Sequence, residues 1–513
     1  MDVHSAIADA LALLPDYLGS HVLISFTAMA LGLLVSLPLA LVALARPRLR
    51  WILLAAASIV QTIPGLALLA LFYPLMLGVA GLAARWFGYN FSALGFFPAV
   101  LALTLYSVLP ILRNTVTGIA GIDPALKQAA VAVGMTRGQS LRMVELPLAL
   151  PVIMAGIRTS AVWVIGTATL STPVGQTSLG NYIFTGLQTQ NWVFVLFGSL
   201  AAAALALTVD QLLAIVQRGL GARRRSLIAG AGIGLLAIIL AALPAVFAHG
   251  EKPYVIGSKP FAEQYVLAAL IQNRLEAAGL PTRRRDSLGS SIVFDALAGG
   301  EIDVYVEYSG TVWADVMRRT DSQPRAETLD AVRTWLLRQH GIHMLGGLGF
   351  ENAYALAMKR RRAGELGIAS IADLARHAPS LSIAGDYEFF GRPEWKALRE
   401  AYGLAFREQR QMQPEFMYPA AGREVDVIAA YSSDGRIEQY ELVTLPDPKQ
   451  VIPPYDAVLL LSPARANDPR IVDALRPLIG AIDLPLIREA NARAAAGAAP
   501  AKIAAWLWEQ IGK

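Results

Sequence analysis

The chain has no cysteine, and charged side chains make up only 16% of its 513 residues. Without cysteine there can be no disulfide, thiolate metal ligand or cysteine nucleophile. The low charge excludes an enzyme that is soluble along its whole length, because soluble proteins carry about 25% charged residues. The six histidines show no metal-ligand spacing, and no Ser–His–Asp set stands out. We therefore expect no catalytic residue, no metal site and no cofactor.

The few charges are also unevenly distributed. Residues 1–225 hold 13 Lys/Arg but only six Asp/Glu, whereas the charge-rich remainder is nearly neutral. A basic, charge-poor half is typical of a membrane protein, so the net charge of +5 does not require a nucleic-acid partner.

Six apolar stretches in the first half are long enough to cross a bilayer, which takes about 20 residues per helix. Each is expected to be helical, because lipid offers no hydrogen-bond partner to a free backbone group. Arg158 and the polar end of the fourth stretch predict that this helix faces protein or a transport pathway. The stretches are residues 20–45, 51–78, 95–119, 150–175, 191–216 and 227–248.

Basic residues occupy alternate loops between these stretches, and basic loops stay in the cytoplasm. We therefore expect a multi-pass protein of the cytoplasmic (inner) membrane, embedded in lipid. Its C-terminal half is expected outside the cytoplasm, in a periplasmic or extracellular position. The basic residues that set this orientation are Arg46, Arg48, Arg50, Lys127, Arg137, Arg142, Arg218, Arg223, Arg224 and Arg225.

The cytoplasmic loop 122–150 has the pattern of two short helices. Asp123 and Pro124 are typical of a helix start, and Gly134 suits the left-handed residue that ends a helix. A second helix is predicted over 136–145, stopping before Pro147.

This loop resembles the coupling loop of ABC importer permeases, which has Glu-Ala-Ala, a Gly four residues later and Leu-Pro about a dozen further on. The chain departs from that pattern only in having Gln in place of the usual Glu. The resemblance implies that the loop docks on an ATP-binding subunit. The matching residues are Gln128, Ala129, Ala130, Gly134 and Pro147.

The chain has no Gly-x-x-x-x-Gly-Lys-Ser/Thr phosphate loop. ATP hydrolysis is therefore expected on the separate subunit, and this chain is not expected to be an enzyme. Because one chain has six spans and one coupling loop, two copies are expected to form a homodimer beside two ATPase subunits.

From about residue 251, short β-like runs alternate with helical ones, which favours an α/β domain with largely parallel sheets. The length suits two lobes, with residues 360–452 inserted as the second, and a cleft between lobes is a natural ligand site. The expected architecture is an all-α, six-helix transmembrane domain over 1–250, followed by a bilobed α/β domain over 251–513.

Four segments of the second half resemble the substrate-binding proteins of glycine betaine/choline/osmoprotectant ABC importers, a family that includes fusions with the permease. The resemblance implies a periplasmic-binding-protein-like fold of type II, joined here to an ABC importer permease. The segments are Gly-Ser-Lys-Pro-Phe-Ala-Glu-Gln (257–264), Tyr-Val-Glu-Tyr-Ser-Gly-Thr (305–311), Asp-Tyr-Glu-Phe-Phe-Gly-Arg-Pro-Glu (386–394) and Asp-Val-Ile-Ala-Ala-Tyr-Ser-Ser-Asp-Gly-Arg (426–436).

The resemblance also implies a ligand with a quaternary ammonium group, such as glycine betaine, choline, carnitine or proline betaine. Such a cation cannot donate a hydrogen bond, so its affinity must come from ring faces and desolvation. By match to the family, the rings are Tyr308, Tyr354, Tyr431 and Tyr455. A ligand carboxylate would be held by Lys259, Thr311 and Arg392, with Glu388 orienting Arg392.

Other interpretations remain open at this point. Some relatives of this family take up ergothioneine, a betaine that the same residues could bind. A membrane receptor that senses a ligand without transport is a further alternative, although it would not need an ATPase dock. The tyrosines could also be ordinary packing, and the Arg392–Glu388 pair could be a surface pair of little energetic value.

Overall fold

The structure is a computed structural model, and it describes residues 3–88, 93–189, 191–243, 253–319, 321 and 323–511. The chain forms two compact units. One consists of Ile7–Phe184 and Val193–Gly250, and the other of Glu251–Lys513 with the short segments Met1–Ala6 and Thr185–Trp192. Residues 244–252 lie outside the described residues, so a domain border between residues 250 and 251 stays a prediction.

The first unit is helical, and six helical segments among the described residues are long and apolar enough to cross a membrane: Ala6–Ala45, Gly65–Phe87, Phe96–Ala120, Arg137–Val174, Trp192–Gly221 and Arg225–Ala242. Its elements are α1 (Val3–Ala45), α2 (Pro47–Thr62), α3 (Gly65–Phe87), α4 (Phe96–Ala120), α5 (Pro124–Ala132), α6 (Arg137–Ser140), a π turn (Leu141–Glu145), α7 (Leu146–Ala168), a 3₁₀ turn (Thr169–Val174), α8 (Gly180–Gln188), α9 (Trp192–Gly221) and α10 (Arg225–Ala242).

The second apolar stretch, predicted as one span over 51–78, is in fact two helices. α2 ends at Thr62, Ile63 is extended, and α3 begins at Gly65. Pro64 causes the break, because proline disfavours helical geometry at the residue before it and has no N–H to donate. At 16 residues α2 is short for a span, so the helix of this stretch that is long and apolar enough to cross a membrane is Gly65–Phe87.

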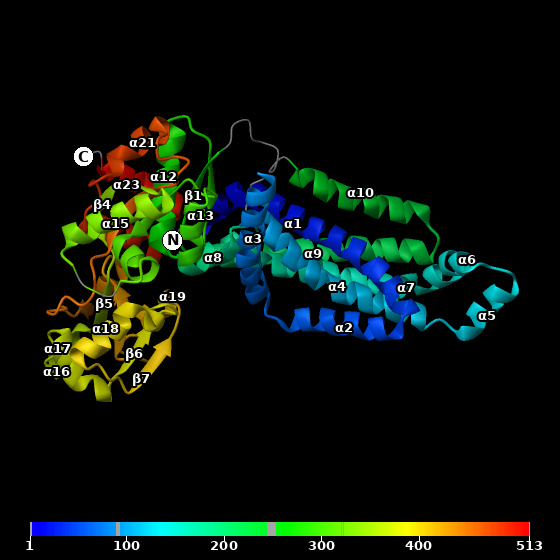
Figure 1. Cartoon of the computed structure of the whole chain (residues 1–513), viewed down its shortest axis with the longest axis horizontal. Helices are drawn as coiled ribbons and strands as arrows, with labels where there is room; N and C mark the ends of the chain where they lie inside the picture. Colours follow the sequence, from blue (N-terminus) through cyan, green and yellow to red (C-terminus); the bar gives the residue numbers. More distant parts are fainter. Residues whose placement is uncertain are drawn as a thin grey trace. The chain divides into compact units, whose positions relative to one another are not determined.

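The loop 122–150 begins as predicted but ends differently. Asp123 caps α5 by accepting a hydrogen bond from the N–H of Ala125 at 2.8 Å, and Gly134 is left-handed with φ +80°. The second helix does not stop before Pro147. It passes through the π turn into α7, since the wider turn accommodates a residue that has no N–H to donate. Figure 1 shows α5 and α6 at one end of the helical unit.

Arg158 of α7 faces protein, as its position predicted. Its Nε and Nη2 each lie 2.8 Å from a carboxylate oxygen of Asp210 on α9, and its Nη1 donates to Gln217 at 3.1 Å. An ion pair within an apolar helix bundle joins the two helices at a place where a single charge would be costly.

The second unit has two five-stranded sheets. The first, in the order β2-β1-β3-β10-β4, contains β1 (Tyr254–Gly257), β2 (Thr282–Arg285), β3 (Val304–Tyr308), β4 (His343–Glu351) and β10 (Asp456–Leu461). The second, in the order β7-β6-β8-β5-β9, contains β5 (Tyr354–Lys359), β6 (Ser382–Gly385), β7 (Glu408–Gln411), β8 (Val427–Tyr431) and β9 (Leu442–Thr444).

Both sheets are mixed, so the expectation of largely parallel sheets was wrong. β1 is parallel to β2 and β3, and β6 is parallel to β7 and β8, but β10 and β5 are antiparallel to their neighbours. The reason is the connection between lobes. β5 follows β4 into the second sheet and β10 returns to the first, so these strands enter their sheets in the opposite direction.

Helices cover both sheets, and Figure 1 shows α12, α15 and α23 on the lobe of the first sheet and α16, α17 and α18 on the lobe of the second. The bounds are α12 (Ala262–Ala277), α13 (Ser290–Ala298), α14 (Ser309–Thr311), a π turn (Val312–Val316), α15 (Arg325–His340), α16 (Arg360–Leu366), α17 (Ile371–His377), α18 (Pro393–Tyr402), α19 (Pro414–Ala420), α20 (Arg436–Gln439), α21 (Pro469–Leu475), α22 (Leu484–Ala495) and α23 (Pro500–Ile511).

Candidate substrate site

The four tyrosines singled out in the sequence stand at strand ends and lie close together. The antiparallel register of β5 and β8 places Tyr354 directly opposite Tyr431, and cross-strand neighbours of this kind bring side chains into contact. Their ring centroids are 5.1 Å apart. Tyr455, the residue before β10, meets the ring of Tyr354 edge-on at 6.2 Å. Tyr308, the last residue of β3, belongs to the same group through an intermediate ring.

That intermediate ring is Phe261, which sequence reasoning did not place in the site. It stacks on Tyr308 at 6.2 Å and on Tyr431 at 6.3 Å, so that it connects the first lobe to the second. Its position in the Gly-Ser-Lys-Pro-Phe segment was the available signal. We call Phe261, Tyr308, Tyr354, Tyr431 and Tyr455 the ring cluster.

Packing explains why residue 310, in the Tyr-Ser-Gly-Thr turn, is a glycine. A Cβ on Gly310 would lie 2.5 Å from carbons of the Tyr455 ring, so no larger residue fits while the ring stays in place. Thr311 follows it in α14 and is buried. The turn therefore packs against Tyr455 and carries Thr311, two of the predicted site residues.

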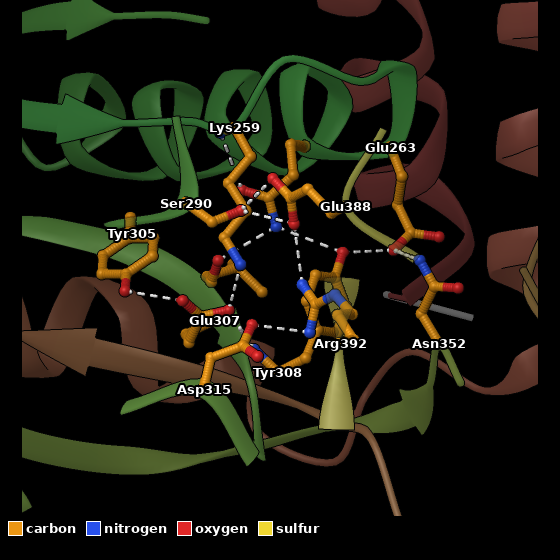
Figure 2. A network of polar contacts seen from close by, with 12 residues as sticks. Lys259, Glu263, Ser290, Tyr305, Glu307, Tyr308, Asp315, Asn352, Glu388 and Arg392 are labelled. Atoms are coloured by element: carbon orange, nitrogen blue, oxygen red, sulfur yellow. Dashed lines mark hydrogen bonds and ion pairs between the residues drawn. The ribbon is translucent and has the colours of Figure 1, made fainter. Parts of the chain in front are cut away.

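Lys259 is already paired within the protein. Its Nζ lies 2.5 Å from Oε1 of Glu307, and the two side chains are 3% and 0% exposed. Glu307 also accepts hydrogen bonds from the hydroxyl of Tyr305 and the backbone N–H of Tyr308. The ammonium of Lys259 stands 5.5 Å from the centre of the Tyr308 ring (Figure 2). Its charge is therefore compensated by a buried, fully hydrogen-bonded carboxylate.

Arg392, at the start of α18, is 7% exposed and lies among acidic groups. Its Nη1 is 2.7 Å from Asp315 on the first lobe, and its Nη2 is 2.8 Å from Glu388 (Figure 2). Glu388 therefore contacts Arg392, as the predicted orienting role requires. Burial works to lower the pKa of Arg392, but Tyr354 and the neighbouring carboxylates outweigh burial and hold the pKa well above its ordinary value.

The guanidinium of Arg392 also covers a ring face, with its central carbon 5.3 Å from the centre of the Tyr354 ring. Its Nε has no hydrogen-bond partner among the described residues. A buried donor without a partner is costly, so this nitrogen is available to an acceptor that enters the site.

Three buried carboxylates, which sequence reasoning also missed, accept the hydroxyls of the four tyrosines. Asp386 accepts from Tyr354 at 3.0 Å and also from Tyr431. Glu394 accepts from Tyr455. Glu263 accepts from Tyr308 at 2.5 Å. These pairings could not be predicted from local sequence patterns, since the partners are 32 to 61 residues apart.

Polar contacts join the two lobes around this group. Glu263 on the first lobe also accepts from Ser433 at 2.6 Å and from Asn352 at 3.1 Å, and burial raises its pKa. Ser290 of α13 donates to Glu388 at 3.1 Å. Together with the Asp315–Arg392 pair, these contacts hold the lobes against each other. The ligand roles predicted for the site residues themselves stay predictions.

The loop 122–150 presents a second candidate surface. Gln128, Ala129, Gly134 and Pro147 are exposed, whereas Ala130 is buried. Apolar side chains stand exposed beside them, with Leu126 at 46%, Val131 at 69% and Val133 at 72%. Exposed apolar residues at such density are typical of a surface that another protein covers.

Two family models match the chain. Residues 252–510 match the substrate binding domain of ABC-type glycine betaine transport systems, and residues 29–226 match the binding-protein-dependent transport system inner membrane component. These domains are a permease and a binding domain, and neither is an ATPase.

The chain is also similar to individual proteins. The ergothioneine transport permease/ergothioneine binding protein of Helicobacter pylori (strain G27) is 28% identical over 429 residues, or 80% of this chain and 74% of that protein. The choline transport system permease protein of Bacillus subtilis (strain 168) is 43% identical over 200 residues, or 39% of this chain and 85% of that one. A crystal structure of a glycine betaine/carnitine/choline ABC transporter is similar to this chain at 25% sequence identity and a TM-score of 0.45. The similarity covers 50% of this chain and 97% of the chain in that structure.

The match over 252–510 spans half of the chain, and the second match covers its membrane helices. The chain therefore belongs to the osmoprotectant ABC importers, as a multi-pass permease fused to a substrate-binding domain of the glycine betaine family.

Proposed function

We propose that this chain imports small quaternary ammonium compounds, of which glycine betaine, choline, carnitine and proline betaine are the candidates. The observation that supports this most is the ring cluster, in which four tyrosines and Phe261 come together from both lobes. A desolvated cation over an aromatic face gains about 2 kcal/mol or more. The position of Arg392 over Tyr354 supports the same view, because one face of the cluster already accepts a cation.

In this proposal the trimethylammonium group contacts the ring cluster, and a ligand carboxylate is held by Arg392, Thr311 and Lys259. Arg392 contributes most, since its Nε has no hydrogen-bond partner among the described residues. Lys259 contributes less, because Glu307 already pairs with its ammonium and compensates its charge.

The transport cycle follows from the two domains. Ligand binding closes the lobes, which already share the Asp315–Arg392 and Ser290–Glu388 contacts. The closed binding domain docks on the permease from outside the cytoplasm, and an ATP-binding subunit docks on the loop that carries Leu126, Val131 and Val133. Two copies of the chain complete the pathway. A receptor without transport would have no use for that docking loop.

Ergothioneine is the second candidate ligand. The Helicobacter pylori protein that carries its name is similar to this chain over both halves, with 80% of this chain matched. Ergothioneine has a trimethylammonium and a carboxylate, so the same residues would bind both ends.

Calorimetric titration of the full-length chain in lipid nanodiscs tests the proposal. We expect saturable heat with at least one of choline, glycine betaine, carnitine, proline betaine and ergothioneine, and none with glycine, whose ammonium carries no methyl groups. The ranking of the ligands decides between the osmoprotectant and ergothioneine candidates. Absence of heat with all five would refute the substrate class.

Acidification through about pH 6 is expected to weaken binding of the ammonium several-fold. Burial raises the pKa of Glu394 to about 6. The positive charge of Arg392 lowers this pKa, and the negative charge of Asp315 raises it. Protonation removes the negative charge that Tyr455 contacts. Unfolding is not the reason, because a carboxyl whose pKa is raised by folding stabilises the fold as the pH falls between about 6 and the ordinary glutamate pKa of 4.5.

Titrations at pH values on both sides of about 6 measure this effect. The matched control is Glu394→Gln, in which the affinity should be lower throughout and should no longer change near pH 6. A wild-type affinity that is constant across this range would contradict the assignment.

A further inference from the structure

Every tyrosine of the ring cluster donates its hydroxyl to a buried carboxylate. Asp386 receives two of them, from Tyr354 and Tyr431, while Glu394 receives Tyr455 and Glu263 receives Tyr308. The three acidic residues are 6%, 3% and 4% exposed, respectively. Four of four is more than packing alone requires, since a phenol hydroxyl is satisfied equally well by a backbone carbonyl or a neutral side chain.

The anionic partner changes what the ring can bind. A hydroxyl that donates to a carboxylate makes a charge-assisted bond and shifts electron density from the proton toward the ring. The ring face, already negative, then attracts a cation more strongly. The negative charge of the carboxylate also attracts the ligand cation directly, because buried surroundings screen charge poorly.

Asp386 is the most securely placed of the three. Its Oδ1 accepts the backbone N–H groups of Glu388 at 2.7 Å and Phe389 at 2.8 Å, while its Oδ2 takes the two tyrosine hydroxyls. All four partners donate, which is the environment that a charged carboxylate needs when buried. The residue therefore holds a fixed negative charge at the hydroxyl ends of two facing rings.

An independent observation points to a cation on these rings. The guanidinium of Arg392 stands 5.3 Å from the centre of the Tyr354 ring, whose hydroxyl Asp386 accepts. Its side chain is 7% exposed, and its Nε has no hydrogen-bond partner within the described ranges. A cation of the protein itself thus lies over a ring whose hydroxyl Asp386 accepts.

We propose that Asp386 is a positioning residue that sets the charge specificity of the ring cluster, and that Glu394 and Glu263 act in the same way on Tyr455 and Tyr308. This inference rests on the proposed function. In this inference, the carboxylates that accept the tyrosine hydroxyls cause the site to prefer a trimethylated cation over an uncharged group of equal shape. In a zwitterionic ligand the same charges direct the ammonium to the rings and the carboxylate away from Asp386, toward Arg392.

The test compares choline with 3,3-dimethylbutan-1-ol, which has the same shape but carbon in place of the charged nitrogen. Both are titrated into the full-length chain in nanodiscs, as wild type and as Asp386→Asn. We expect the variant to bind choline about tenfold more weakly and the alcohol almost unchanged, so that the ratio of the two affinities falls about tenfold. A purely structural role would weaken both ligands together, and that result would overturn the proposal.

Two further variants keep the result interpretable. The double variant Tyr354→Phe/Tyr431→Phe retains both rings but uncouples them from Asp386, so it should reduce the same ratio in the same direction. Asp447→Asn is the matched control, because Asp447 also accepts a tyrosine hydroxyl, from Tyr402, but outside the ring cluster. Its ratio should equal that of the wild type.

The outcomes separate the two claims. If no trimethylammonium ligand binds the wild-type chain, the proposed function fails and this inference fails with it. If choline binds the wild type and the ratio is the same in Asp386→Asn, the proposed function stands and only the role of Asp386 is refuted.

Discussion

Tyr354→Leu is expected to weaken binding of a trimethylammonium ligand by about 30-fold or more. Tyr354 is the centre of the ring cluster, with Tyr431, Tyr455 and the Arg392 guanidinium all within 6.2 Å of its ring centre. Loss of one desolvated cation–ring contact costs about 2 kcal/mol, and 1.4 kcal/mol is a factor of ten in affinity. Leucine keeps an apolar side chain at this buried position of β5, so the strand should remain in place.

The measurement is calorimetric titration of the full-length variant, supported by its melting temperature. Tyr440→Leu is the matched control, because Tyr440 also has a cation near its ring, Lys359 at 5.9 Å, but makes no ring contact with the cluster among the described residues. The control should bind as the wild type does. Equal affinity in Tyr354→Leu and wild type would mean that the ammonium binds elsewhere.

Gly134→Trp is expected to abolish transport while leaving ligand binding unchanged. Gly134 ends α5 with φ +80° at an exposed position of loop 122–150, the proposed docking site of the ATP-binding subunit. No atom lies within 4 Å of a Cβ placed there, so a bulky side chain would project from the protein surface. It would then occupy the space in which the ATP-binding subunit is proposed to approach Val131 and Val133.

The measurement is ligand-stimulated ATP hydrolysis and uptake by the assembled transporter in vesicles, with binding measured in parallel. Gly134→Asn separates bulk from backbone strain, because asparagine tolerates the left-handed region and adds a short side chain. We expect Gly134→Asn to retain most of the uptake. Normal uptake in Gly134→Trp would show that this loop is not the site of coupling.

The sequence was sufficient to predict the main architecture, because the membrane helices and the helix ends depend on strong local signals. Hydropathy summed over about 20 residues locates membrane helices, and the cap at Asp123 and the glycine at 134 depend only on neighbours a few residues away. The same summation explains the error at 51–78, because one proline barely changes the mean hydropathy of a stretch that it divides. The π turn before Pro147 could not be predicted either, because the pattern that was used assumes regular α-helical geometry.

The site was predictable where residues stand in recurrent motifs and not where they meet through the fold. The four tyrosines were identified in this way, and the structure brings them together. Asp386, Glu394 and Asp315 were missed as partners because their contacts cross between strands or lobes, as in the Tyr455–Glu394 bond. The direction of β5 and β10, which places Tyr354 beside Tyr431 and Tyr455, is also a tertiary property.

The most direct test is an electron cryomicroscopy map of the full-length chain in nanodiscs with the tightest-binding trimethylammonium ligand. The account predicts ligand density with its ammonium within about 6 Å of the ring centres of Tyr354, Tyr431 and Tyr455. Ligand density at any other position, with these rings packed only against one another, would contradict it.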